Sequence, residues 1–284
     1  MVDPQLHAAP LGVFDSGLGG LTVVRALLDA LPDERIVYLG DTARVPYGTR
    51  SPTTVIRYAR GCARVLTQRG IKALVVACNT VSAVALDMLR ADFDLPVVGV
   101  IEPGAQAAVA AADRRGSGKI GVLGTPGTVA SGAYPRAVAQ LSTRLEVVAQ
   151  SAPLLVPLVE EGWLEGEVPE LAVRRYLEPL TRAEVGVILL GCTHYPLLKP
   201  VVKCVAARLS GADLPVVDSA VATADVVRAL LEDGRIPRAA PEGDGRPRLE
   251  LLVTDLPAGF ADRAALFLGT HEMPRVLQVD LEPG

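Results

Sequence analysis

Lysine is scarce in this sequence of 284 residues, and it occurs only as Lys72, Lys119, Lys199 and Lys203. None of the four lies in the glycine-rich turn or the cysteine motifs described below. Enzymes that use pyridoxal phosphate hold this cofactor as a Schiff base on a lysine. We therefore expect a protein that works without pyridoxal phosphate.

Long apolar runs and a basic amino-terminal segment are also missing. Half of the residues are apolar, yet no stretch approaches the roughly 20 residues that a membrane-spanning helix needs. Residues 1–10 carry an acidic side chain rather than a basic cluster, and they lack the apolar run of a signal peptide. We expect a soluble, cytoplasmic protein with no membrane partner.

Positive charge is not in excess, because the formal net charge is -4. Nucleic-acid-binding proteins usually carry a basic patch, so we expect no nucleic-acid partner. The cysteines, at positions 62, 78, 192 and 204, are too few and too scattered for a disulfide framework. We therefore expect free thiols. The ligand spacing of common zinc motifs is also missing, so we expect no metal site.

The sequence does contain a regular alternation of short apolar runs with longer segments of helical periodicity, such as residues 53–69. This alternation is typical of buried parallel strands joined by helices. The length favours about two domains. We predict an α/β fold of two flavodoxin-like lobes with parallel sheets, and an active site in the cleft between them. The predicted strands of the two lobes are residues 11–14, 36–39, 73–77, 97–101, 120–123, 145–149 and 187–190.

Two pairs of segments resemble each other and indicate pseudo-symmetry between the lobes. Residues 11–17, LGVFDSG, resemble residues 120–126, IGVLGTP. Residues 73–80, ALVVACNT, resemble residues 187–194, VILLGCTH, with a cysteine directly after each apolar run. The pattern favours an internal duplication in which Cys78 and Cys192 occupy equivalent places.

The lobe boundaries follow from the assumption that residues 215–218, PVVD, return the chain to the first lobe. On this assumption the first lobe comprises residues 11–100 plus 214–284, and the second comprises residues 101–213. Residues 234–248 are rich in proline, glycine and arginine, so we predict an irregular excursion there. Residues 249–254 and 276–279 are predicted strands that flank a helix and return to a sheet edge.

The two equivalent cysteines are the strongest candidates for chemistry. Ligands of open α/β sheets bind at the carboxyl ends of strands, where helix amino termini favour negative charge. A thiol there is expected to have its pKa lowered toward working pH, which makes it a usable base. A cysteine after a buried strand is also a common small core residue. The polar neighbours Asn79, Thr80, Thr193 and His194 favour the functional interpretation. By contrast, the helical spacing of Cys62 and Cys204 among apolar residues predicts core positions.

Polar residues in two further loops are candidates for the same site. Asp15 and Ser16 open a glycine-rich turn, where they could bind substrate or simply cap the following helix. The turn lacks a complete phosphate-loop or dinucleotide pattern, so we expect no nucleotide or flavin. Tyr47 and Gly48 lie in a loop after a predicted strand, where function is common, although an ordinary turn would also explain them.

Two residues of the second half could assist a cysteine. Glu160 lies at the end of a predicted helix, where its charge opposes the helix dipole, so a functional role or a solvated surface position would each explain it. His194 follows Cys192 by two residues and suits acid/base work near neutral pH, although a buried structural histidine is also common. A metal site of Cys78, Cys192 and His194 is conceivable by ligand type alone. Two thiols without a cofactor favour a reaction with proton transfer at opposite faces of one carbon, which racemisation requires.

Five segments together resemble the glutamate racemases, within the aspartate/glutamate racemase family. The resemblance runs from about Leu11 to Gly234, and the tail from Arg235 shows no familiar motif. It implies a cofactor-independent isomerase that supplies D-glutamate for peptidoglycan and cell-wall synthesis, usually as a homodimer. The segments are FDSGLGGL at 14–21, GDTARVPYG at 40–48, ACNT at 77–80, VIEPG at 100–104 and GCTHYP at 191–196.

The resemblance also implies residue roles. Cys192 would be the base toward L-glutamate and Cys78 the base toward D-glutamate. Asp15, Glu160 and His194 would assist them. The substrate would be bound by Asp15, Ser16, Tyr47, Gly48, Asn79, Thr80, Thr193 and His194.

Three other functions remain open at this point. An aspartate racemase or another two-cysteine relative would show the same spacing, because spacing does not measure a substrate's length. Some members of the family bind and inhibit DNA gyrase, but no residue here allows that activity to be assigned. A gyrase-binding regulator on the same fold would not need both cysteines. A hydrolase that uses Cys192 and His194 would leave Cys78 without a role.

Overall fold

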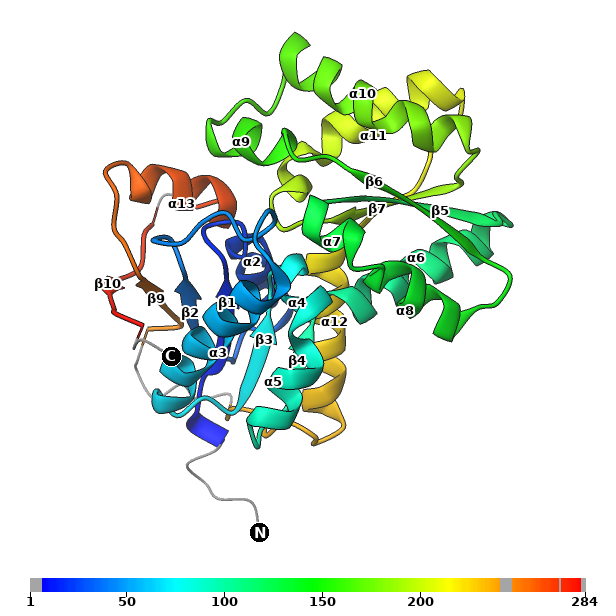
Figure 1. Ribbon diagram of the computed structural model, residues 1–284. Coiled ribbons are helices and arrows are strands. Elements are labelled where there is room, and N and C mark those ends of the chain that lie inside the picture. Colours follow the sequence, from blue (N-terminus) through cyan, green and yellow to red (C-terminus); the bar gives the residue numbers. More distant parts are fainter. Residues whose placement is uncertain (1–6, 241–246, 271, 282–284) are drawn as a thin grey trace.

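The computed structural model describes residues 7–240, 247–270 and 272–281, which form two α/β lobes, each built on its own parallel sheet (Figure 1). In the first sheet the strand order is β10-β9-β2-β1-β3-β4. Its strands are β1 (Leu11–Asp15), β2 (Ile36–Gly40), β3 (Ala73–Val76), β4 (Val97–Gly99), β9 (Leu249–Val253) and β10 (Val276–Gln278). In the second sheet the order is β6-β5-β7-β8. Its strands are β5 (Lys119–Gly124), β6 (Glu146–Ser151), β7 (Val187–Gly191) and β8 (Val216–Asp218).

Helices cover both faces of each sheet, which explains why the strands are apolar at successive positions. In β1, Val13 packs in the cluster that contains Leu21 and Leu27, while the next residue, Phe14, packs in the cluster that contains Val55. Side chains alternate between faces along a strand, so both faces of this sheet are buried. The first lobe carries α2 (Leu21–Ala30), α3 (Pro52–Gln68), α4 (Asn79–Val84), α5 (Leu86–Asp92) and α13 (Phe260–Leu268).

The helix α3 shows how local sequence sets an element. Ser51 precedes it, and its hydroxyl accepts a hydrogen bond from the Thr54 backbone N–H (3.4 Å), which caps the helix. Pro52 occupies the first turn, where the missing N–H has no intrahelical acceptor in any case. The buried residues recur every three or four positions and include Cys62, as predicted for that cysteine.

The second lobe repeats the order of the first. Strands β2-β1-β3-β4 and β6-β5-β7-β8 have the same chain order, and the pairing registers agree. Leu11 pairs with Ala73 in the first sheet, and its sequence counterpart Ile120 pairs with Val187, the counterpart of Ala73. The predicted pseudo-symmetry is therefore present at the level of single residues. The second-lobe helices are α7 (Pro126–Ala130), α8 (Ala133–Leu141), α9 (Leu155–Glu160), α10 (Glu167–Arg182), the 3₁₀ helix η1 (Tyr195–Leu198) and α11 (Lys199–Ser210).

Two long helices connect the lobes. The helix α6 (Ile101–Arg115) follows β4 of the first sheet and packs on β5, β7 and β8 of the second. The helix α12 (Ser219–Glu232) follows β8 of the second sheet and packs on α2 and β4 of the first. The two helices contact each other, and α12 extends from the second lobe along the side of the first (Figure 1). Each lobe thus ends in a helix that packs on the other lobe.

The assumption about residues 215–218 is wrong, because β8 pairs with β7 in the second sheet. The duplication explains this result: β4 closes the first repeat at the sheet edge, and β8 is its counterpart in the second. We accordingly propose a boundary near residue 218 in place of 214. The strand predicted at residues 97–101 is also shorter than expected, since it ends at Gly99 and Ile101 begins α6.

The predicted return of the tail to a sheet edge is confirmed. The strand β9 pairs with β2, and β10 pairs with β9 at the edge of the first sheet. Residues 235–240 are irregular, as expected for the excursion at 234–248, and residues 241–246 lie outside the described part of the chain.

Cys204 is exposed, so its predicted core position is wrong. The buried stripe of α11 consists of Val201, Val202, Val205 and Ala206, and Cys204 lies off it. Within the described residues, no helix is long and apolar enough to cross a membrane.

Candidate active site

A cavity of about 150 Å³ lies between the lobes, at the carboxyl ends of the parallel strands. Residues after β1, β2 and β3 meet residues after β5, β6 and β7 there. Nine of the predicted site residues line the cavity. They are Ser16, Tyr47, Gly48, Cys78, Asn79, Thr80, Glu160, Thr193 and His194. Asp15 and Cys192 are buried and are not among its lining residues.

Cys78 lies two residues after the end of β3 and is the residue that precedes α4. Its thiol donates a hydrogen bond to Ser16 Oγ, 3.7 Å away. Burial and, to a smaller extent, the neighbouring Asp15 raise the pKa of Cys78 to about 12, against smaller lowering effects of the Val81 backbone and Ser16. The expectation of a thiol with a lowered pKa is therefore wrong for Cys78 in this closed cavity, because desolvation outweighs the helix amino terminus.

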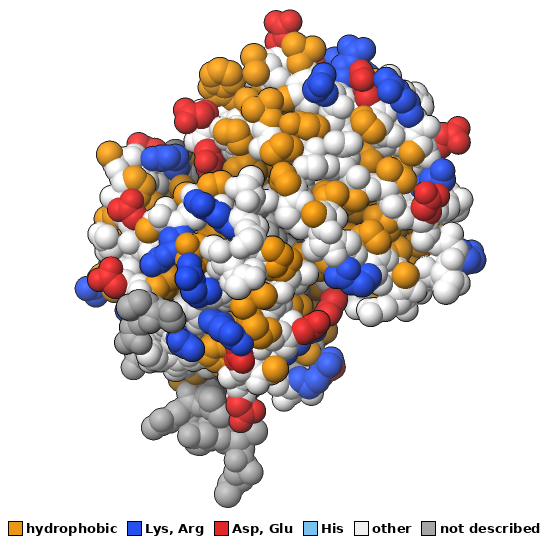
Figure 2. Space-filling view, viewed as in Figure 1, with side chains coloured by type: hydrophobic (Ala, Val, Ile, Leu, Met, Phe, Trp, Pro, Cys, Tyr) orange, Lys and Arg blue, Asp and Glu red, His pale blue; other side chains and the backbone are white. Residues whose placement is uncertain are grey.

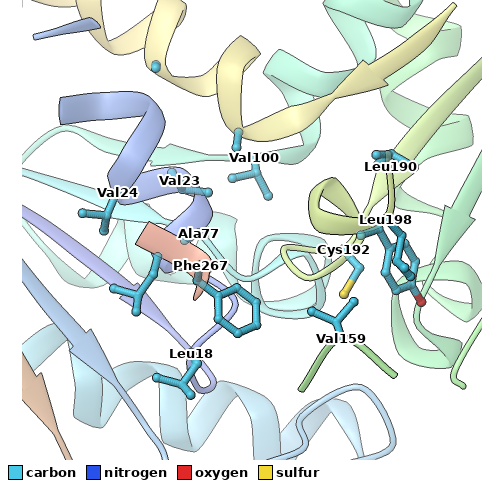
Figure 3. Close-up of a cluster of buried hydrophobic side chains, with 14 of the residues drawn as sticks. Leu18, Val23, Val24, Ala77, Val100, Val159, Leu190, Cys192, Leu198 and Phe267 are labelled. Atoms are coloured by element: carbon cyan, nitrogen blue, oxygen red, sulfur yellow. The ribbon is translucent and has the colours of Figure 1, made fainter. Parts of the chain in front are cut away.

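Cys192 occupies the equivalent place after β7. It is 6% exposed and lies in an apolar cluster with Val159, Leu198 and Phe267 (Figure 3). Its Sγ lies 3.9 Å from His194 Nδ1. A charge on Cys192 raises the pKa of Cys78, so the two thiols are near enough to interact. The polar contact of Cys192 is thus a histidine, whereas that of Cys78 is a serine.

His194 connects Cys192 to a carboxylate. Its Nε2 lies 3.0 Å from Glu160 Oε1, and the other ring nitrogen faces Cys192. Burial lowers the pKa of His194, but its hydrogen bonds to Cys192 and Glu160 outweigh this effect, and the pKa is raised to about 10. The hydrogen bond to His194 also lowers the pKa of Glu160. The pair is therefore an imidazolium and a carboxylate at neutral pH.

Asp15 stabilises the glycine-rich turn by accepting hydrogen bonds from its backbone. Its Oδ2 accepts hydrogen bonds from the backbone N–H groups of Gly20 (2.9 Å) and Gly17 (3.3 Å). Asp15 therefore holds the turn, whereas the residue that caps the following helix α2 is Gly20. Its other oxygen, Oδ1, is buried and has no hydrogen-bond partner among the described residues. Burial raises the pKa of this carboxyl, while the positive charge of His194 lowers it.

The loop at residues 41–48 forms one wall of the cavity and is held at both ends. Asp41 accepts hydrogen bonds from the hydroxyls of Tyr47 and Thr254, the latter at 2.7 Å. At the other end, the Gly48 carbonyl accepts a hydrogen bond from the Gly127 N–H of the second lobe (2.9 Å). The Tyr47 hydroxyl donates to Asp41, and Tyr47 also lines the cavity.

Hydroxyl groups from both lobes meet where Thr80 and Thr125 line the cavity. Thr80 Oγ1 lies 3.0 Å from Thr125 Oγ1 and 3.4 Å from Thr128 Oγ1. Thr125 was not among the predicted site residues, although the match of LGVFDSG with IGVLGTP makes it the counterpart of Ser16. That comparison was the signal that could have identified it.

The lobes meet closely beside His194. The Thr22 hydroxyl donates to the Thr193 carbonyl at 2.9 Å, and the backbone of Gly19 packs against Thr193 and His194. Phe267, from α13, contacts the His194 ring edge-on with centroids 5.2 Å apart. No sequence pattern in the tail pointed to Phe267, because the contact depends on how α13 packs.

Metal-binding side chains do not cluster in the part of the chain that the structure describes. Among residues 7–240, 247–270 and 272–281, no three of histidine, cysteine, aspartate or glutamate are grouped to hold a metal ion. The conceivable site of Cys78, Cys192 and His194 gains no support from this arrangement.

Comparison with known proteins places these residues in a family. A sequence model described as Asp/Glu/Hydantoin racemase matches residues 17–227. The chain belongs to this racemase family. The recognition of its motifs is therefore confirmed, and the enzyme class is an isomerase that acts as an amino-acid racemase.

Relatives of this racemase family match nearly the whole chain. A glutamate racemase of Geobacter metallireducens is 48% identical over 96% of this chain and 97% of its own length. The glutamate racemase from Francisella tularensis, whose crystal structure is in complex with D-glutamate, has 34% sequence identity to this chain. Its TM-score is 0.86, with 97% of this chain and 99% of that chain covered. That from Thermus thermophilus, in complex with beta-chloro-D-alanine, is 44% identical, with a TM-score of 0.83 and coverages of 97% and 98%.

Proposed function

We propose that this racemase interconverts L-glutamate and D-glutamate without a cofactor, using Cys78 and Cys192 as opposed acid/base thiols. The observation that carries the proposal is the equal register of β1 with β3 and of β5 with β7, which gives the two cysteines equivalent places. Two thiols related in this way approach one substrate carbon from opposite sides. The names of the relatives, glutamate racemases at 42–48% identity, support glutamate as the substrate.

Cys192 is the proposed base toward L-glutamate. The imidazolium of His194, 3.9 Å from its sulfur, stabilises negative charge on the thiolate. Glu160 holds this imidazolium in its charged form, since its carboxylate lies 3.0 Å from Nε2. At the same distance, a positive charge stabilises a thiolate far more in a buried site than in bulk water, because the buried site has a lower dielectric constant. The Cys192 thiolate removes the α-proton and becomes a thiol.

Cys78 is the proposed acid in the same direction. Its pKa of about 12 keeps the thiol protonated at neutral pH, so it holds a proton to deliver. The carbanion left by Cys192 receives this proton on the opposite face, which inverts the centre. Asp15 assists by keeping Cys78 protonated until the carbanion forms. In the reverse direction the roles exchange, because every step is reversible.

Polar groups around the cavity are proposed to hold the two carboxylates and the ammonium group. Donors come from both lobes: Ser16, Asn79 and Thr80 from the first, and Thr193 from the second. Tyr47 and Gly48 line the cavity from the loop at residues 41–48. Closing both lobes around one substrate fixes its α-carbon between the thiols and excludes water, which strengthens these interactions.

The decisive experiment follows hydrogen in heavy water. When L-glutamate is converted, the D-glutamate formed should carry deuterium at Cα, while the remaining L-glutamate initially stays unlabelled. The reason is that Cys78 has exchanged its proton with solvent, whereas the proton taken by Cys192 is not returned to the same face. A coupled assay for D-glutamate measures the turnover, and mass spectrometry measures the label.

Alanine variants provide the matched test. Cys78→Ala and Cys192→Ala should each abolish conversion to the opposite enantiomer, and the exposed Cys204→Ala should retain full activity. The two-thiol mechanism is excluded by early product that retains the substrate's own hydrogen, or by normal racemisation in either of the first two variants.

Aspartate is the alternative substrate, because its two carboxylates could meet the same donors. The comparisons favour glutamate, since the relatives that match nearly the whole chain are glutamate racemases. Parallel assays with L-aspartate and L-glutamate discriminate between them, and a higher kcat/KM for aspartate would replace the proposed substrate.

The proposed cellular role is to supply D-glutamate for peptidoglycan in the cytoplasm, as a homodimer. Apolar side chains of α9, α10 and their flanking loops are exposed and give a surface on which a second copy could pack, namely Leu154, Trp163, Val168 and Leu171. Figure 2 shows hydrophobic side chains gathered over this side of the second lobe. Sedimentation equilibrium of the full chain measures the mass, and a monomer at all concentrations would exclude the dimer.

A further inference from the structure

One wall of the cavity carries a buried amide with an unpaired donor. Asn79 is 2% exposed and lines the cavity. Its Oδ1 accepts a hydrogen bond of 2.7 Å from the Tyr134 hydroxyl. Its Nδ2 is buried and has no hydrogen-bond partner among the described residues. Because a buried N–H without an acceptor is rare and costly, this donor is suited to a ligand that supplies one.

Tyr134 reaches Asn79 from the other lobe. It belongs to α8 of the second lobe and is 1% exposed, whereas Asn79 begins α4 of the first. A glycine makes room for the tyrosine. A Cβ at Gly191 would lie 2.8 Å from the ring atom Cε2. The segment 191–196, noted in the sequence for its resemblance, thus leaves space for this side chain.

The tyrosine hydroxyl is a neutral donor in this place. Burial raises the pKa of Tyr134, and a hydrogen bond from Ser219 lowers it by less, so the phenol keeps its proton. Ser219 begins α12, the helix that leads back to the first lobe. The hydroxyl therefore lies near the first turns of α6 and α12, in contact with the first-lobe amide.

We propose that Tyr134 is a positioning residue that orients the Asn79 amide toward the substrate. Because its hydroxyl engages Oδ1, the amide presents Nδ2 to the cavity, where it donates to a substrate carboxylate. A freely rotating amide would present its oxygen as often as its nitrogen, and an oxygen repels a carboxylate. The inference rests on the proposed function, in that the substrate is an amino acid with carboxylate groups.

The variant Tyr134→Phe removes the hydroxyl and leaves the ring. The KM for glutamate should rise about fivefold to tenfold in both directions, as expected for loss of one oriented hydrogen bond. The kcat should change by less than about twofold, because Asn79 exchanges no proton with the substrate. The matched control is Tyr176→Phe, whose hydroxyl accepts from the Leu154 N–H at 3.3 Å outside the cavity. This control should keep the wild-type KM.

Two further variants separate positioning from general destabilisation. Asn79→Ala and Asn79→Ala with Tyr134→Phe should share the same KM, since the second change has no amide left to orient. Thermal unfolding of each variant verifies folding. A wild-type KM in Tyr134→Phe, or a further KM increase in the double variant, would overturn the inference.

The proposed function and this inference fail in different ways. If the wild-type chain binds glutamate but does not racemise it, the proposed function is wrong. Calorimetric dissociation constants for glutamate, compared between wild type and Tyr134→Phe, then still test the role of Tyr134. An equal constant for the two proteins would overturn it, and weaker binding by the variant would support it.

Discussion

At the scale of single residues, the two thiols differ in what surrounds them, although their backbone positions are equivalent. Cys78 contacts Ser16, and its burial together with the nearby carboxyl of Asp15 raises the pKa of its thiol. Cys192 faces the imidazolium of His194, which is paired with Glu160. The duplicated fold gives the two thiols equivalent backbone positions, and the different neighbours give them different polar contacts.

The raised pKa of His194 predicts a pH dependence of folding stability. Below the ordinary pKa of 6.5 both folded and unfolded states bind the proton, so the stabilisation is fully present. Between 6.5 and about 10 only the folded state holds it, and the stabilisation is lost as pH rises through this window. One proton corresponds to a slope of at most about 1.4 kcal/mol per pH unit.

Chemical denaturation at several pH values between 7 and 9.5 measures this slope. We expect the free energy of unfolding of wild type to fall more steeply with pH than that of His194→Gln. The variant His7→Gln, at an exposed position, should follow the wild type. Equal slopes in wild type and His194→Gln would show that the folded protein does not hold this proton.

At the scale of elements, the loop at residues 41–48 depends on the end of β9. The Thr254 hydroxyl donates to Asp41 Oδ1 at 2.7 Å and accepts from the Ala43 N–H at 2.9 Å. Asp41 in turn accepts from Tyr47, which lines the cavity. A strand of the C-terminal tail thereby supports a loop from the beginning of the chain.

Thr254→Val should weaken both the fold and substrate binding. The change keeps the shape but removes the hydroxyl that donates to the Asp41 carboxylate and accepts from the Ala43 N–H, and loss of these hydrogen bonds costs about 1–3 kcal/mol. We expect a lower free energy of unfolding and a raised KM for glutamate, measured by denaturation and by the coupled assay. Thr254→Ser keeps the hydroxyl and should retain the wild-type KM. If the valine variant binds glutamate as tightly as the serine variant, the loop does not depend on this contact.

At the scale of the whole molecule, the site depends on how closely the lobes approach. A Cβ at Gly19 would lie 2.3 Å from Thr193 Oγ1 and 2.4 Å from His194 Nδ1. Gly19→Ala should therefore displace the second-lobe residues beside Cys192. A misplacement of about 1 Å at a reacting group costs up to about 100-fold in rate.

Steady-state kinetics of Gly19→Ala should show this loss in kcat/KM. The matched control is Gly118→Ala, because a Cβ at Gly118 meets no atom within 4 Å. The control should match the wild type in both activity and melting temperature. Wild-type kinetics for Gly19→Ala would mean that the lobes adjust without moving His194.

Several features of the fold and the site were predictable from the sequence because they depend on local pattern. Buried strands and amphipathic helices leave apolar periodicities, and the repeated strand-cysteine motif predicted the equivalence of Cys78 and Cys192. The duplication would also have placed residues 215–218 in the second sheet, if these residues had been matched with the last strand of the first repeat. The error arose because a short apolar strand carries no mark of the sheet it joins.

The tertiary structure alone decided the charge states and the partners across the lobes. The pKa of Cys78 is raised because desolvation depends on everything packed around the thiol, which no local motif encodes. Tyr134 reaches Asn79, and Phe267 reaches His194, only because helices distant in the chain are packed beside the site. The sequence by itself determined the strands, the polar turns that follow them and the places of the two thiols. Packing determined how those thiols are buried, charged and oriented.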